Sequence, residues 1–116
     1  MTFDDWKNLG CVRLYCEALV GLDVTAMKDW ADFKELVYRA DRSDIVLKAR
    51  RLASASTRHD FVALAAVLMA MDYSSTAVEL DAKHGSVLGH WQFTTGERLD
   101  ALIGVLSMSK EPAIAA

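Results

Sequence analysis

Histidine and cysteine, two residue types that often bind metals, are sparse in this chain of 116 residues. Its histidines are His59, His84 and His90. Histidine ligands on one helix usually repeat at three or four residues, whereas His84 and His90 stand six apart across Gly85, with no cysteine nearby. We therefore expect no metal site at these histidines, and no other cofactor.

Nucleophilic chemistry is not indicated either. The two cysteines, Cys11 and Cys16, lie in an apolar stretch, and apolar surroundings raise the pKa of a thiol instead of activating it. The segment 85–89 lacks the Gly-x-Ser-x-Gly spacing of a nucleophile elbow, and the chain has no glycine-rich phosphate loop. These patterns predict a protein that is not an enzyme.

Charge is distributed unevenly along the sequence. The net charge is −3, but residues 39–58 hold six basic and two acidic residues (+4), and the remainder holds seven basic and fourteen acidic residues (−7). This segment can bind an acidic protein or a phosphate backbone, or be the solvated side of a helix. After Tyr38, which directly precedes it, the segment contains no aromatic residue, so stacking on the bases of a single strand is not supported. The candidate partner-binding residues are Arg42, Lys48, Arg50 and Arg51.

A second candidate contact lies nearer the carboxyl end. Trp91 and Phe93 alternate with His90 and Gln92, in a segment over 86–93 for which the sequence predicts no regular structure. Large aromatic side chains contribute much of the energy of interfaces, so such a segment is suited to a protruding contact. We therefore include His90, Trp91 and Phe93 among the candidate partner-binding residues.

The elements that position these groups are predicted to be helices around one apolar run. Phe61 to Met71 are consecutive apolar residues, which as a helix would rise ~16 Å, about half the thickness of a bilayer's hydrocarbon core. The run is too short to span a membrane and is apolar on every side, so it predicts a buried central helix. This helix is expected over about 57–73, with Thr57 as its N-cap.

The first helix is expected over about 3–22, with apolar residues on two opposite sides. Such a helix either lies deep in its own fold or has one side covered by a second chain. We favour a second copy of this chain. The candidate dimer interface is Trp6, Leu9, Val12, Cys16 and Leu19.

Capping residues predict the remaining helices. Asp23 is expected to begin a helix that continues to about residue 39, and Ser43 or Asp44 one that continues to about residue 53. Thr76 and Thr94 are each followed three residues later by glutamate. This capping-box pattern predicts two further helix starts.

The sequence therefore predicts an all-α fold, a compact five- or six-helix single domain over 1–109, followed by a frayed C-terminal tail over 110–116. Apolar residues make up 53% and charged residues 25%, an ordinary composition for a globular protein. The amino-terminal residues lack the pattern of a secretory signal, and two reduced thiols fit the cytosol. We expect a cytoplasmic protein with no membrane partner.

The favoured functional hypothesis is a small non-enzymatic protein–protein interaction module, such as an adaptor, an inhibitor or a regulatory subunit, that forms a homodimer. Three observations lead to it: no catalytic constellation, a first helix with two apolar sides, and the segregated charge. The alternative is a nucleic-acid-binding regulator that uses the basic segment 39–58. Its binding would weaken steeply with salt.

Overall fold

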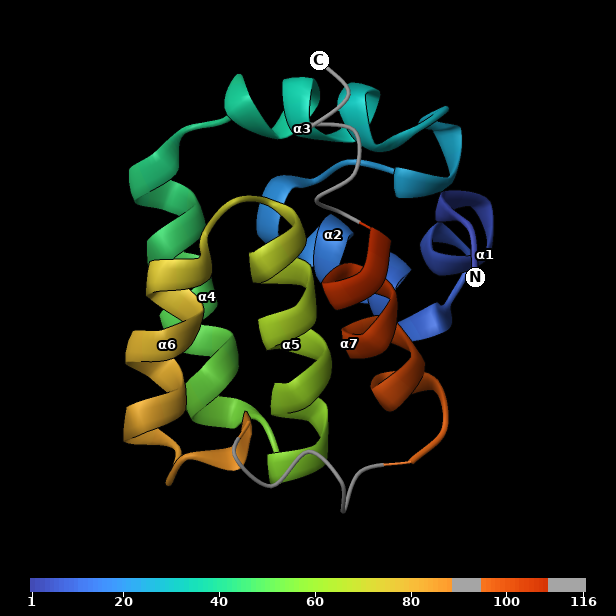
Figure 1. Ribbon diagram of the computed structural model, residues 1–116. Helices are drawn as coiled ribbons and strands as arrows, with labels where there is room; N and C mark the ends of the chain where they lie inside the picture. Colours follow the sequence, from blue (N-terminus) through green and yellow to red (C-terminus); the bar gives the residue numbers. More distant parts are fainter. Residues whose placement is uncertain (89–94, 109–116) are drawn as a thin grey trace.

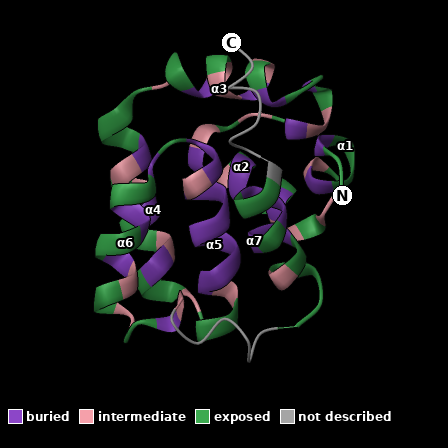
Figure 2. Ribbon diagram, in the orientation of Figure 1, coloured by how far each residue is buried: buried purple, intermediate pink, exposed green. Residues whose placement is uncertain are grey.

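Helix α5 (Arg58–Ala70) runs through the middle of a helical bundle, as its apolar run predicts (Figures 1 and 2). Thr57 caps it, because its hydroxyl accepts a hydrogen bond from the Asp60 N–H at 3.2 Å. Every side chain from Phe61 to Leu68 is 0% exposed. A helix that is apolar all round is stable only where neighbours cover every side, and this is the arrangement observed.

The computed structural model describes residues 1–88 and 95–108, which contain seven α-helices and the short 3-10 helix η1. They are α1 (Phe3–Lys7), α2 (Gly10–Val20), η1 (Val24–Ala26), α3 (Trp30–Tyr38), α4 (Arg42–Ala55), α5 (Arg58–Ala70), α6 (Ser74–Lys83) and α7 (Glu97–Met108). The predicted all-α domain is confirmed, with seven α-helices in these two ranges instead of five or six in all. The predicted tail over 110–116 lies outside the described residues.

The other helices enclose α5. Helices α7, α6, α2 and α4 pack directly against it, while α3 crosses one end of the bundle and α1 lies beside α7 (Figure 1). No helix in the described ranges combines the length and the apolar character needed to cross a lipid bilayer.

An aromatic cluster joins α1 to α3 and α7. The ring centroids of Phe3 and Trp6 each lie 4.7 Å from that of Trp30, and the Trp6 centroid lies 5.8 Å from that of Phe33. The indole N–H of Trp6 donates a hydrogen bond to the carbonyl of Ala101 at 2.9 Å. Two segments 95 residues apart in sequence are thereby held together.

The expected first helix over 3–22 is in fact two helices. Helix α1 ends at Lys7, and Leu9 adopts an extended conformation before α2 begins at Gly10. The Asn8 side chain donates to the carbonyl of Asp4 at 2.7 Å, which satisfies one of the last carbonyls of α1. The break lets α1 leave the direction of α2 and bring its aromatic residues to α3.

Several predicted helix starts are wrong by a few residues. Asp23 caps the short η1, and α3 begins only after Asp29, whose carboxylate accepts from the Asp32 N–H at 2.8 Å. Asp41, not Ser43 or Asp44, caps α4. Helix α6 already begins at Ser74, so Thr76 is a buried residue inside it. Thr94 lies outside the described residues.

Candidate functional site

The candidate dimer interface lies inside the bundle. Four of its side chains are 0% exposed: Trp6, Val12, Cys16 and Leu19. The remaining one, Leu9, is half-buried. Neighbouring helices of the same chain cover this side of α1 and α2, so these side chains are not available to a second copy. The structure therefore corrects this choice of interface, and a dimer would need another surface.

The opposite side of α2 is only partly at the surface. Leu14 is 63% exposed, while Tyr15 is 7% exposed. Cys11 and Ala18 are half-buried. Single exposed apolar residues are normal on protein surfaces, so Leu14 by itself does not mark an interface.

Two of the four predicted basic residues are paired with carboxylates. The Lys48 ammonium lies 2.9 Å from the carboxylate of Asp44, one turn earlier in α4. The Arg50 guanidinium lies 3.4 Å from the carboxylate of Glu79 on α6. All four side chains are at least 41% exposed, so these pairs contribute little to stability. They do reduce the positive potential that a phosphate backbone would meet.

The other two predicted basic residues lie at different places on α4. Arg42 is its first residue, and its guanidinium lies 4.6 Å from the ring centroid of Tyr73. Arg51 is exposed nine residues later, ~13 Å further along the helix axis. The structure therefore does not gather the four basic side chains into one continuous surface.

Of the histidines in the described residues, His84 packs against neighbouring groups and His59 lies at the surface. The Nε2 atom of His84 lies 2.6 Å from the carbonyl oxygen of Ala53, and its ring stacks on Phe61 with centroids 4.7 Å apart. His59 is exposed in the first turn of α5. No group of three histidine, cysteine or acidic side chains in the described ranges is placed to hold a metal ion.

The two thiols are poor nucleophiles. Burial, together with the nearby charge of Glu97, raises the pKa of the Cys11 thiol to about 12. Burial raises the pKa of the Cys16 thiol to about 12 as well. A thiol with such a pKa stays protonated at neutral pH, and the thiolate is the reactive form.

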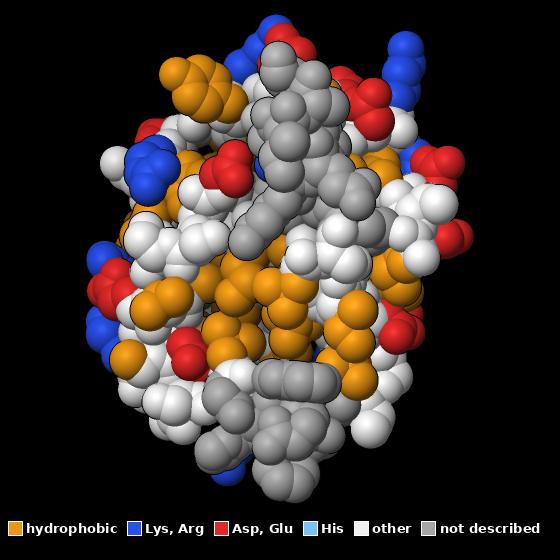
Figure 3. Space-filling view, in the orientation of Figure 1, with side chains coloured by type: hydrophobic (Ala, Val, Ile, Leu, Met, Phe, Trp, Pro, Cys, Tyr) orange, Lys and Arg blue, Asp and Glu red, His pale blue; other side chains and the backbone are white. Residues whose placement is uncertain are grey.

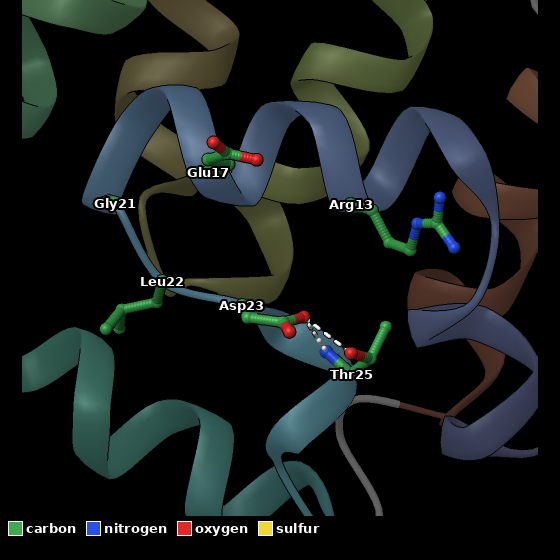
Figure 4. A pocket seen from close by; sticks show the side chains of 6 residues that line it. All are labelled: Arg13, Glu17, Gly21, Leu22, Asp23 and Thr25. Atoms are coloured by element: carbon green, nitrogen blue, oxygen red, sulfur yellow. Dashed lines mark hydrogen bonds between the residues drawn. The ribbon is translucent and has the colours of Figure 1, made fainter.

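An open concavity of about 450 Å³ lies at the C-terminal end of α2 (Figure 4). The Asp23 carboxylate accepts from the Thr25 N–H at 3.0 Å and from its hydroxyl at 2.5 Å, and these bonds lower the pKa of Asp23. In Figure 4 the Arg13 guanidinium points away from Glu17. The polar groups therefore do not converge on one point, and Asp23 serves as the cap of η1.

The predicted aromatic contact, His90, Trp91 and Phe93, lies outside the described residues and stays a prediction. Exposed apolar side chains also lie on α7. Ile103 is 48% exposed and Leu106 is 57% exposed, and both lie on one side of the helix.

Helix α7 thus has a second apolar side besides the one that packs in the core. Leu102 and Val105 face the core, at 4% and 2% exposure. Leu99, which is half-buried, precedes Ile103 by four residues and Leu106 by seven. This i, i+4, i+7 spacing aligns the three side chains, which we call the α7 stripe.

Figure 3 shows the face of the bundle on which α6 and α7 flank α5. Hydrophobic side chains gather between these two helices, and several acidic side chains lie around them. On α6, Val78 is 63% exposed. The next residue, Glu79, pairs with Arg50 of α4 and so points toward that helix. Because successive helical residues point about 100° apart, Val78 points away from α4.

No family model, curated protein or solved structure matches this chain.

The α7 stripe could not be predicted from the sequence, because Leu102 lies next to Ile103 and both residues fit helical spacing. Periodicity shows that a helix has apolar sides, but it does not show which of two adjacent sides packs inward.

Proposed function

We propose that this chain is a non-enzymatic protein–protein interaction module that docks a helix of its partner on the α7 stripe. The observation that carries the proposal is the exposure of Ile103 and Leu106, at 48% and 57%, beside a core in which the α5 side chains from Phe61 to Leu68 are 0% exposed. Apolar anchors spaced along one side of a helix are a recurring means by which proteins recognise amphipathic helices.

The proposed partner helix carries basic residues beside its apolar side. Asp100 is exposed three residues before Ile103, so the two side chains are neighbours on α7. Acidic side chains also lie around the hydrophobic face in Figure 3. Complementary charge increases the rate of encounter and fixes the orientation of a bound partner.

A second copy of this chain would present the same acidic surroundings, and like charges oppose close approach. We therefore favour a different protein as the partner over a homodimer. The twelve residues of α7 rise only ~18 Å. A stable complex usually buries roughly 800 Å² on each partner. The interaction is accordingly proposed to be weak and reversible.

The nucleic-acid alternative has less geometric support, because Lys48 and Arg50 already pair with carboxylates. It predicts binding to duplex or single-stranded nucleic acid that falls steeply as salt is added. Absence of binding at low salt would count against it.

The proposal is tested by photo-crosslinking in the native host. A photoreactive residue in place of Ile103 is expected to form an adduct with one reproducible partner. The same residue in place of Leu14, which is 63% exposed on α2, is the matched control and is expected to give only background. Adding Leu106→Glu should abolish the adduct, because a charge would have to be buried, whereas Leu47→Glu on α4 should leave it unchanged.

Sedimentation velocity across micromolar concentrations separates the two kinds of partner. A monomer that still forms the adduct supports a different protein. A concentration-dependent dimer that Leu106→Glu disrupts would mean that the occupant of the α7 stripe is a second copy. Equal labelling from positions 103 and 14 would contradict the proposed surface altogether.

A further inference from the structure

A separate cavity lies where the end of α3, the start of α4 and the turn between α5 and α6 meet, at the upper left of Figure 1. Its volume is about 420 Å³, within the range of roughly 300–1,000 Å³ that is typical of small-molecule sites. The side chains that matter are two cations, two tyrosines and one carboxylate: Lys34, Arg42, Tyr38, Tyr73 and Asp72.

Arg42 is positioned in this cavity by an aromatic ring. Its guanidinium lies 4.6 Å from the ring centroid of Tyr73. Tyr73 is only 5% exposed, so the surrounding side chains restrict its ring, and its backbone N–H donates to the Leu68 carbonyl at 2.8 Å. None of the ion pairs among the described residues involves Arg42. A stacked guanidinium keeps its N–H donors for an anion.

The electrostatics of the cavity favour an anion. Arg42 is the first residue of the fourteen-residue helix α4, whose N-terminus is already capped by the Asp41 carboxylate, so the helix end itself adds little to the attraction of an anion. Lys34 adds a second cation, and its ammonium lies 3.9 Å from the Asp72 carboxylate. Two cations and one carboxylate give these side chains a net charge of +1.

Tyr38 supplies an aromatic surface beside these charges. It is the last residue of α3 and is 90% exposed, the highest value among the large hydrophobic side chains of the described residues. A ring so exposed contributes little to the core, but it can stack on a planar ligand.

Asp72 adds a hydrogen-bond acceptor at an unusual position. It follows the end of α5 with a φ of 65°, a left-handed conformation in which glycine is the usual residue. Its side chain is 73% exposed. A side chain retained in such a conformation is a reason to look for a function at the site.

We propose that this cavity binds a mononucleotide. The phosphate contacts Arg42 and Lys34, the base stacks on Tyr38, and the Asp72 carboxylate accepts a hydrogen bond from an N–H group of the base. Inorganic phosphate would use only the cations. Phosphotyrosine would bring a phosphate and a ring, but no N–H donor on the ring. Only the nucleotide carries an N–H donor on the ring that stacks on Tyr38.

The proposal is tested by titrating the 15N-labelled protein with AMP, phosphotyrosine and inorganic phosphate at constant ionic strength, followed by NMR. AMP is expected to cause saturable shifts at residues 34–42 and 71–73. Its affinity should exceed that of phosphate by about tenfold, because stacking adds to the phosphate contact.

Variants identify the groups that bind. Arg42→Gln is expected to weaken AMP binding about tenfold, because charge-assisted hydrogen bonds are lost. Tyr38→Leu is expected to weaken it about fivefold or more by removing the stacking surface. Arg51→Gln is the matched control, since it removes the same charge ~13 Å further along α4 and should leave the affinity unchanged. Thermal midpoints equal to that of the wild type would show that the variants are folded.

Four results would overturn the proposal. Equal affinity for AMP and phosphate would mean that the ring and the carboxylate contribute nothing. Tighter binding of phosphotyrosine than of AMP would remove the role given to Asp72. AMP shifts that persist in Arg42→Gln, or no shifts with any of the three probes, would show that the cavity is not the site. If Arg42→Gln does not fold, Arg42→Lys, which keeps the charge but not the planar fork, is expected to weaken AMP binding and replaces it in the test.

Discussion

Removal of the Glu97 carboxylate is expected to loosen the junction between α7 and α2. Helix α2 receives no side-chain cap from Leu9, the residue before it. A Glu97 carboxylate oxygen instead accepts the backbone N–H of Cys11 at 2.6 Å, across 86 residues of sequence. The first N–H groups of a helix need acceptors, so Glu97 both caps α2 and joins it to α7.

The magnitude follows from these contacts. A side-chain cap is worth about 0.5–2 kcal/mol, and a negative charge at a helix N-terminus about 0.3–1 kcal/mol. These two contributions overlap and are not simply added, because the same carboxylate makes both. We therefore expect Glu97→Ala to lower the free energy of unfolding by about 1–2 kcal/mol. Glu97→Gln keeps an acceptor and should cost less. Asp100→Ala removes a nearby exposed carboxylate as the control and should cost ~0.5 kcal/mol or less.

The effect should depend on pH with a definite sign. The hydrogen bond from the Cys11 N–H lowers the pKa of the Glu97 carboxyl below its ordinary value of 4.5. A group whose pKa is lower in the folded state stabilises the fold above its unfolded pKa, and this stabilisation is lost as the pH falls through the folded pKa. The difference between wild type and Glu97→Gln should therefore be present at neutral pH and vanish in acid.

Urea unfolding at neutral and acidic pH, followed by circular dichroism, measures these free energies. A loss below ~0.3 kcal/mol for Glu97→Ala at neutral pH would refute the reasoning, because even the dipole contribution would then be missing. A difference between wild type and Glu97→Gln that does not change with pH would refute the electrostatic part alone.

Three further substitutions test the packing and the backbone. Leu68→Ala is expected to lower the free energy of unfolding, measured in urea, by about 2–5 kcal/mol, because Leu68 is 0% exposed. Leu14→Ala, at a 63% exposed site, is the control and should lower it by under ~0.5 kcal/mol. Similar losses for the two variants would contradict the assigned core. Asp72→Gly should raise the thermal midpoint, because relief of the left-handed conformation is worth about 1 kcal/mol, and a lower midpoint would argue against that strain. Trp6→Phe should cost about 1–3 kcal/mol through the lost bond to Ala101 and the smaller ring, and an unchanged urea midpoint would contradict this.

The central helix could be predicted from sequence because its signal is local. A run that is apolar on every side, with Thr57 and Asp60 at its start, has few other structural solutions, and the structure places it where expected. The break before α2 could not be predicted in this way. Leu9 continues the apolar spacing of Trp6 and Val12, so the pattern runs through the break. The acceptor for the first N–H groups of α2 comes from the distant Glu97.

The candidate sites depend even more on distant contacts. Arg42 and Tyr38 are close in sequence, but Tyr73, which orients the Arg42 guanidinium, comes from the turn after α5. The exposure of Ile103 likewise depends on which side of α7 packs against α5. Neither relation leaves a pattern in the sequence near these residues.

The central claim is that α5 is closed off by its own chain while the α7 stripe is open. Methyl NMR with a soluble paramagnetic agent, at a concentration where the protein is monomeric, ranks the solvent exposure of individual side chains. We expect the methyl groups of Leu64 and Leu68 to show almost no added relaxation, and those of Ile103 and Leu106 to show strong relaxation. Leu64 methyls relaxed as strongly as those of Ile103, or Ile103 methyls as protected as those of Leu64, would contradict the account.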